Sequence, residues 1–133
     1  MILVTEAYTP SCSHRIEEIA SCASINASLG IFEQTIKLDA APGRLCFGTV
    51  FRECAARWPG QVCVLANADI FFDESALLLP SIATHGRLIA LSRWDTPSSP
   101  CMLGHLHGAR FFSGSQDVWA FTGGDLVGVA DGI

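Results

Sequence analysis

The hydrophobic pattern of the chain alternates between short apolar runs and longer segments with helical spacing. The short runs are bounded by turn or polar residues and predict four strands, at Ile2–Ala7, Ile31–Leu38, Val62–Ala66 and Leu88–Ser92. The segments between and after them predict helices, from about Ser13 to Ser28, from about Cys46 to Arg57, and within 74–83. This alternation predicts a single α/β domain with a mostly parallel, Rossmann-like sheet and flanking helices.

Boundary signals accompany the predicted helices. Ser11 or Ser13 can cap the first helix, and Gly30 can end it. Apolar residues at helical spacing predict the buried face of that helix, which comprises Ile16, Ile19, Ala20, Ala23 and Ala27. Asp73 can cap the short helix, and Pro80 should end or interrupt it.

The last third of the chain has a weaker pattern. Residues 96–110 are rich in Pro, Gly and His and predict a surface loop. A turn is predicted at Ser113–Asp117, between the apolar patches Phe111-Phe112 and Val118–Phe121. Residues 122–133 are Gly-rich and are predicted to be a frayed tail, which leaves a domain of residues 1–121.

Composition narrows the class of protein. The chain has 133 residues, of which half are apolar and 16% are charged, and these values predict one globular domain. The formal net charge of −5 argues against a general nucleic-acid-binding protein, which would carry a basic patch. No apolar run approaches the roughly 20 residues of a membrane span. The N-terminus lacks the basic region of a signal peptide, so we expect a cytoplasmic protein by default.

The six cysteines include no C-x-x-C pair, which gives no support to zinc-finger or thioredoxin-like sites. We expect most of them to be reduced core residues, because a core of this size needs no disulfides. Cys101, His105 and His107 could be soft metal ligands. Their spacing matches no standard zinc pattern, however, and favours an ordinary loop.

Two polar side chains follow the predicted strand Val62–Ala66, which is apolar enough to be buried on both faces. In an extended chain, Asn67 and Asp69 point to the same side. The carboxyl end of a buried strand is where open α/β sheets bind ligands. Oxygen atoms there suit a hard cation such as Mg²⁺ or Mn²⁺ together with substrate phosphates. The alternative interpretation is a strand end followed by an Asx turn.

A second polar cluster follows the predicted strand Leu88–Ser92 and should lie at the same edge of the sheet. Arg93 has a planar fork that suits phosphate, or it forms an ion pair with Asp95 or Asp73. Trp94 offers a flat face to a sugar ring or a base, or it is part of the core.

A third polar cluster lies between the apolar patches near the end of the chain. Asp117 could act as a general base toward an incoming hydroxyl group, or it could cap a helix. Trp119 is open to the same two interpretations as Trp94, a ligand platform or a core residue.

Together, three motifs resemble a group of glycosyltransferase-like proteins with the GT-A (nucleotide-diphospho-sugar transferase) fold. They are, in order, Val-Leu-Ala-Asn-Ala-Asp-Ile-Phe-Phe-Asp (64–73), Ala-Leu-Ser-Arg-Trp-Asp (90–95) and Ser-Gln-Asp-Val-Trp-Ala-Phe (115–121). The predicted first helix fits the same pattern through Arg15, Glu18, Cys22 and Asn26. The resemblance covers residues 1–121.

The resemblance implies a nucleotide-sugar donor bound at the carboxyl ends of the strands. In the wider fold, an Asp-x-Asp motif holds a divalent cation against the diphosphate. Asn67 and Asp69 match that motif, so Asp69 is expected to hold Mn²⁺ or Mg²⁺ and Asn67 to contact the substrate. Asp117 matches by order the acidic residue that deprotonates the acceptor. Thr5 and Asp39, at the ends of the first two strands, are expected near the nucleobase.

The predicted function is therefore metal-assisted transfer of a sugar from a nucleotide-diphosphate sugar to a hydroxyl acceptor, with Arg93, Trp94, Asp95 and Trp119 completing the substrate site. Complete domains of this fold are usually longer, so we expect either a truncated domain or a diverged end. The alternative is a degenerate or truncated transferase domain that binds a nucleotide or glycan without catalysis. A phosphatase with an aspartyl nucleophile is disfavoured, because Asn67 stands where the nucleophile would be.

Overall fold

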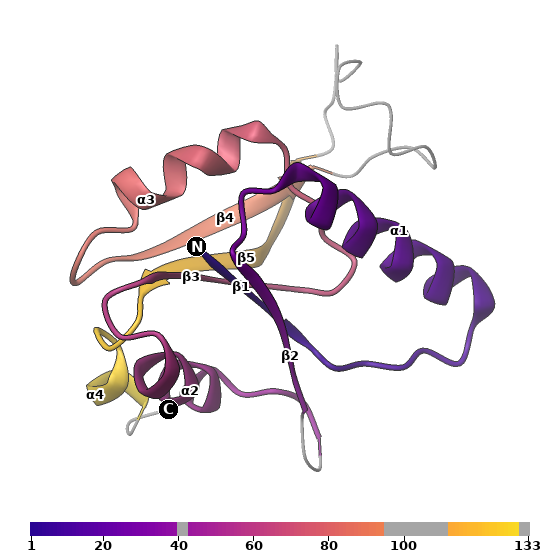
Figure 1. The fold of residues 1–133 in the computed structure, drawn as a ribbon. Coiled ribbons are helices and arrows are strands. Elements are labelled where there is room, and N and C mark those ends of the chain that lie inside the picture. Colours follow the sequence, from indigo (N-terminus) through magenta and orange to yellow (C-terminus); the bar gives the residue numbers. More distant parts are fainter. Residues whose placement is uncertain (40–42, 95–111, 131–133) are drawn as a thin grey trace.

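A five-stranded sheet runs through the middle of the molecule (Figure 1). The structure is a computed structural model and describes residues 1–39, 43–94 and 112–130. In chain order the strands are β1 (Ile2–Glu6), β2 (Gln34–Leu38), β3 (Val62–Ala66), β4 (Leu88–Trp94) and β5 (Phe112–Thr122). Their spatial order is β2-β1-β3-β5-β4. β1 pairs in parallel with β2 and β3, whereas β5 is antiparallel to both β3 and β4. The α/β class is confirmed, and the sheet is mixed.

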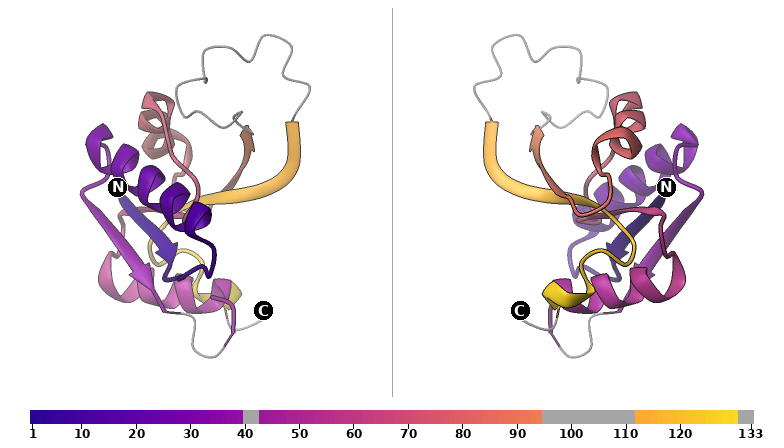
Figure 2. Two further views of the ribbon diagram at one scale, coloured as in Figure 1. Left: turned by 90° about the vertical axis from the view of Figure 1, so that its right-hand side faces the viewer. Right: turned by 90° about the vertical axis from the view of Figure 1, so that its left-hand side faces the viewer.

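Helices cover both faces of this sheet (Figures 1 and 2). They are α1 (Ser13–Leu29), α2 (Phe47–Arg57), the 3₁₀ helix η1 (Glu74–Leu78), α3 (Leu79–Ile82) and α4 (Val127–Ala130). α1 and α3 lie on one side, and α2 and α4 lie on the other. Within the described part of the chain, no helix is long and apolar enough to cross a membrane.

β3 is buried on both faces, as its uninterrupted apolar sequence predicts. Cys63 and Leu65 pack toward α2 in one core cluster, while Val64 and Ala66 pack toward η1 and α3 in the other. The strand therefore joins two hydrophobic layers, and its carboxyl end is held in place from both sides. The predicted bounds Val62–Ala66 are confirmed.

The segment around Ser113–Asp117 is not the predicted turn but part of the eleven-residue strand β5. β5 lies between β3 and β4: residues 118–122 pair with β3, whereas the segment of the predicted turn pairs with β4, where Gln116 lies opposite Ser92 and Phe112 opposite Trp94. These partners outweigh the weak strand propensity of glycine and serine. β5 also makes the sheet mixed, which corrects the prediction of a mostly parallel sheet.

The buried face of α1 differs from the predicted one. Its buried residues are Cys22 and Asn26, whereas Ile16 is 49% exposed. The remaining members of the predicted face are partly or fully exposed: Ile19, Ala20, Ala23 and Ala27. The predicted cap is also wrong, because Cys12 is at the N-cap and makes no side-chain bond there. Gly30 ends the helix in the left-handed conformation at φ 68°, as predicted.

Other boundaries shift by a few residues. β2 begins at Gln34 instead of Ile31, and β4 extends to Trp94. α2 begins one residue later than predicted and ends at Arg57 as predicted. Asp73 caps η1 by accepting a hydrogen bond from Ser75 N. Pro80 does not end the helical segment but lies in the first turn of α3, just after the 3₁₀ helix η1 gives way to it, where its missing N–H group costs nothing.

Five cysteines lie in the described residues, and all five are free thiols. Cys22, Cys54 and Cys63 are buried, as the sequence predicts, whereas Cys12 and Cys46 are exposed. Cys101, His105 and His107 lie outside the described residues, so the metal site weighed there stays a prediction.

The chain after β5 is packed against the domain, which contradicts the predicted frayed tail for residues 122–130. Gly123 N donates to Gln61 O at 2.8 Å, and Gly60 N donates to Gly123 O at 2.9 Å. Gly86 N donates to Asp125 Oδ2 at 2.7 Å. Leu126 packs against the core cluster on the α2 side. Residues 131–133 lie outside the described part of the chain.

Replacing Gly123 by alanine tests this packing. A Cβ atom there would lie 2.2 Å from Trp58 O and 3.0 Å from Cys54 O, both backbone atoms that cannot turn aside. We expect Gly123→Ala to lower the free energy of unfolding by about 2 kcal/mol or more, measured in urea. Gly128→Ala is the matched control, because a Cβ there meets nothing within 4 Å. Equal stability of the two variants would show that the segment is loosely held.

Candidate functional site

A cavity of about 590 Å³ opens at the carboxyl ends of β1 and β3. Its walls come from segments far apart in sequence: Glu6 at the end of β1 and Tyr8 after it, Arg15 and Ile19 on α1, residues 43–45 and 47 before and in α2, residues 65–69 at the end of β3 and after it, and Trp119 on β5. Its volume is in the range of small-molecule sites. The cavity is therefore where the carboxyl-end rule for open α/β sheets places a ligand site.

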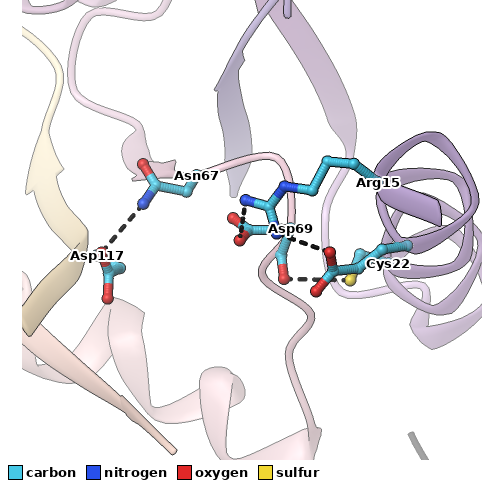
Figure 3. Close-up of polar contacts among 6 residues, drawn as sticks. Arg15, Cys22, Asn67, Asp69 and Asp117 are labelled. Atoms are coloured by element: carbon cyan, nitrogen blue, oxygen red, sulfur yellow. Dashed lines mark hydrogen bonds and ion pairs between the residues drawn. The ribbon is translucent and has the colours of Figure 1, made fainter. Parts of the chain in front are cut away.

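Asn67 lines this cavity and binds Asp117 (Figure 3). Its Nδ2 donates to Asp117 Oδ1 at 3.0 Å, and its backbone N donates to Asp117 O at 3.3 Å. A carboxylate offers only acceptors, so the amide must turn its nitrogen toward Asp117. Asn67 Oδ1 is then left as an acceptor. The two residues, predicted separately as a substrate contact and a general base, form one pair.

Asp69 also lines the cavity, and its carboxylate is paired with Arg15. Arg15 Nη2 lies 2.7 Å from Asp69 Oδ2, and Arg15 Nη1 lies 2.6 Å from Glu18 Oε2 (Figure 3). Hydrogen bonds to Glu18 and to Asp69 raise the pKa of the Arg15 guanidinium, so it stays charged. The Asp69 side chain is 13% exposed and the Arg15 side chain 42%. Arg15 thus supplies a fixed cation to the cavity wall.

The polar face of α1 also holds the backbone that follows Asp69. Cys22 Sγ donates to Asp69 O at 3.2 Å. Asn26 Nδ2 donates to Ile70 O at 2.9 Å, and Asn26 Oδ1 accepts from Phe72 N at 2.9 Å. Burial, followed by the charges of Asp69 and Glu18, raises the pKa of the Cys22 thiol to about 11, so it keeps its proton and donates. The helix residues that carry the resemblance therefore hold the site loop.

Asp117 is 6% exposed and is not part of the cavity lining. It is the extra residue of a β-bulge, because Leu91 pairs with Val118 while the next residue, Ser92, pairs with Gln116. Bulges re-aim side chains and are frequent beside active sites. Asp117 lies within a strand and caps no helix, so the helix-cap interpretation is wrong. Its carboxylate is connected to the cavity through Asn67, which lines the cavity and donates a hydrogen bond to Asp117.

Aromatic side chains form another part of the wall. Trp119 and Phe47 both line the cavity and pack edge to face, with ring centroids 4.9 Å apart. Both pack against the core cluster on the α2 side. Tyr8, two residues after the end of β1, is 55% exposed and lines the cavity too. Trp119 is therefore partly buried against the core and also lines the cavity, and its role as a ligand platform stays a prediction.

The other predicted site residues lie elsewhere or are not fully described. Thr5 is buried and Asp39 is exposed, and neither lines the cavity. Arg93 and Trp94 form the end of β4, and their side chains lie outside what the structure describes. Asp95 lies outside the described residues. The predictions for Arg93, Trp94 and Asp95 stay predictions.

Glu6, Tyr8, Arg44 and Phe47 line the cavity and were missed by the sequence reasoning. The sequence contains a signal for Glu6, because Glu6 is the last residue of the first strand and its neighbour Thr5 is predicted to lie near the ligand. Successive side chains of a strand point to opposite faces, so a site on the face of Glu6 excludes Thr5. Glu6 Oε1 also accepts a hydrogen bond from Leu45 N at 3.1 Å. This bond ties the segment before α2 to the end of β1.

Asp69 is the residue expected to hold a cation, and its described surroundings can be compared with that expectation. Asp69 supplies a single carboxylate, and one oxygen of that carboxylate is already bonded to Arg15. Over residues 1–39, 43–94 and 112–130, no group of three or more His, Cys, Asp or Glu side chains is placed to hold a metal ion. A divalent cation at Asp69 therefore stays a prediction from the sequence, and no chemical step below depends on it.

Comparison of the chain with protein-family models, with curated proteins and with solved structures gave no match. A functional proposal for this chain therefore depends on the geometry of the cavity and on the motifs that line it. Four residues of those motifs lie together on the cavity wall, namely Arg15, Asn67, Asp69 and Trp119.

The Asn67–Asp117 pair predicts the effect of restoring an acid at position 67. Asn67→Asp would put two carboxylates at hydrogen-bond distance, which raises the pKa of one of them. An acid whose pKa is higher in the folded than in the unfolded state destabilises the folded protein once the pH exceeds the unfolded-state value. We therefore expect the free energy of unfolding to fall by about 1 to 2 kcal/mol at pH 7, and this loss should disappear as the pH falls toward 4. Urea unfolding across this pH range measures it.

Gln61→Glu is the matched control, since it makes the same amide-to-acid change at an exposed residue outside the cavity lining. A loss in Asn67→Asp that does not depend on pH, or one that the control reproduces, would contradict the charge-pair interpretation.

Proposed function

We propose that this chain binds a nucleotide-diphosphate sugar in the cavity beside Asn67 and transfers the sugar to a hydroxyl acceptor. The observation that carries the proposal is the grouping of Arg15, Asn67, Asp69 and Trp119 around one cavity at the carboxyl ends of β1 and β3. Asn67 and Asp69 come from one motif of the resemblance, Trp119 comes from another, and Arg15 comes from the first helix, so segments far apart in sequence converge as a shared ligand site requires.

The cavity wall offers contacts suited to each part of such a donor. Tyr8, Phe47 and Trp119 provide flat apolar surface for a base or a sugar ring. Arg15 and Arg44 provide donors for phosphate oxygens. Asn67 Oδ1 and the carboxylate of Glu6 provide acceptors for sugar hydroxyl groups. The polar groups are few and lie beside apolar surface, as is typical of small-molecule sites.

In the proposed reaction, the acceptor oxygen bonds to the anomeric carbon of the sugar. The bond from that carbon to the diphosphate oxygen breaks, and the diphosphate leaves with the electron pair. Asp117 takes the proton of the acceptor hydroxyl as general base. Asn67 holds the Asp117 carboxylate through its amide nitrogen, so the base keeps one orientation. Arg15 offsets negative charge on the leaving diphosphate.

A second function is favoured by one observation, the burial of Asp117. A general base must come within hydrogen-bond reach of the acceptor, whereas Asp117 is 6% exposed and lies outside the cavity lining. The alternative is a domain that binds a nucleotide or glycan in the same cavity without catalysis. The two functions share the ligand site and differ only in the role of Asp117.

Binding in this cavity can be tested with a variant that fills it. Ala68 lines the cavity, so Ala68→Phe would add a ring to the space for the ligand. A panel of nucleoside diphosphates and nucleotide sugars should raise the melting temperature of the wild type, because a ligand of the folded state stabilises it by mass action. We expect Ala68→Phe to lose this shift.

Ala23→Phe, on the exposed face of α1, is the matched control and should keep the shift. A ligand that stabilises Ala68→Phe as strongly as the wild type binds elsewhere, and that result would refute the proposed site.

The role of Asp117 can be tested by Asp117→Asn. The new amide can still accept from Asn67 Nδ2 through its oxygen, so we expect the fold and the affinity for the donor to change little. Loss of the base should reduce the transfer rate by roughly 10² to 10⁴-fold. Asp73→Asn is the control, because asparagine also caps a helix and Asp73 lies outside the cavity lining.

Steady-state transfer rates and calorimetric donor affinities measure the two effects. An unchanged rate in Asp117→Asn would assign Asp117 to structure alone. Donor binding without any transfer by the wild type would favour the non-catalytic alternative.

A further inference from the structure

Arg15 is the positive charge that the structure places next to Asp69. One terminal nitrogen of its guanidinium binds Asp69 at 2.7 Å, and the other binds Glu18 at 2.6 Å. The side chain lines the cavity and keeps 42% of its surface exposed. The guanidinium is therefore held by two carboxylates and remains accessible to a ligand.

A divalent cation and Arg15 would compete for the same carboxylate. A cation bound at Asp69 Oδ2 would lie within a few ångströms of the guanidinium, and like charges at that distance repel each other. The cation would also have to break an ion pair whose carboxylate is mostly buried. Glu18 favours the guanidinium in this competition, because it holds the other nitrogen in place.

The charges on the cavity wall do not favour a free cation either. The cavity lining contains two basic residues, Arg15 and Arg44, and two acidic residues, Glu6 and Asp69. Glu18 is not part of the lining but is bonded to Arg15. A Mg²⁺ or Mn²⁺ ion at such a site takes one or two carboxylates along with substrate phosphates, and the Asp69 carboxylate is already paired with Arg15. A wall that contains two arginines can accept an anionic diphosphate without a metal ion.

We propose that Arg15 takes the place of a divalent cation at Asp69 and binds the diphosphate directly, so that nucleotide binding at this site needs no metal. This inference rests on the function proposed above. A guanidinium has five N–H donors, more than the two ion pairs use. Glu18 and Asp69 are positioning residues, which hold the Arg15 guanidinium in one orientation. Less conformational entropy of Arg15 is then lost when phosphate binds.

Calorimetric titration with a nucleoside diphosphate, in EDTA and in Mn²⁺, tests the inference. We expect the wild type to bind with the same dissociation constant in both. Arg15→Gln should bind about tenfold to a hundredfold more weakly, as loss of a charge-assisted hydrogen bond predicts. The corresponding nucleoside, which lacks phosphates, should bind the wild type and the variant equally. That comparison separates phosphate binding from a structural effect of the substitution.

Two further variants complete the experiment. Arg15→Lys keeps the positive charge but loses the planar guanidinium, so its affinity for the diphosphate should lie between those of the wild type and Arg15→Gln. If Arg15→Gln does not fold, Arg15→Lys replaces it in the experiment. Arg87→Gln is the matched control, because Arg87 is exposed and lies just before β4, at the edge of the sheet away from the cavity.

The possible failures can be told apart. Tighter diphosphate binding by the wild type in Mn²⁺ than in EDTA would overturn the inference and leave the proposed function standing. Equal diphosphate affinities of the wild type and Arg15→Gln would do the same. If no nucleotide binds to any form under either condition, the proposed function fails, and the inference fails with it.

Discussion

The candidate site depends on the hydrogen bonds that Asn26 makes to the loop after β3. This buried amide donates to Ile70 O and accepts from Phe72 N, so both of its polar groups are satisfied by backbone. A buried amide that lost these partners would pay the full cost of desolvation, which makes the contact specific. The neighbouring Arg15–Asp69 pair is partly exposed, and exposed ion pairs contribute little stability. The neutral hydrogen bonds of Asn26 therefore hold the loop after β3 in place. The Arg15–Asp69 ion pair determines the charge that this loop presents to the cavity.

The sequence predicted what depends on local pattern and missed what depends on distant partners. The bounds of β3 followed from its uninterrupted apolar run, and Asn67 and Asp69 followed from its carboxyl end. Their partners lie about fifty residues away, since Asn67 binds Asp117 and Asp69 binds Arg15. No spacing rule connects positions so far apart. The buried face of α1 was missed because Cys22 and Asn26 bond to the backbone of the loop after β3, so the apolar residues of the helix do not mark it.

An amide at position 67 has a physical reason in the fold. Asp117 is buried, and Asn67 satisfies one of its oxygens without adding charge. At Asp69 the charge is balanced by Arg15. Each acid of the two motifs therefore has a protein partner of its own. The resemblance implies a metal ion at Asp69 and a general base at Asp117, whereas the described geometry pairs Asp69 with a guanidinium and Asp117 with an amide.

The position of β5 has a consequence for the order in which the domain assembles. β3 is central to the sheet, yet one of its edges is completed by a strand that begins at residue 112. During synthesis, β1, β2 and β3 can pair before Val118–Thr122 has been made. Until then, the backbone N–H and C=O groups on one edge of the apolar strand β3 have no partner strand. An open edge of this kind can pair with another chain. The slow step of folding should therefore be the pairing of β5 with β3, because it brings together two strands that are far apart in the sequence. The nascent chain should be most prone to aggregation just before this pairing.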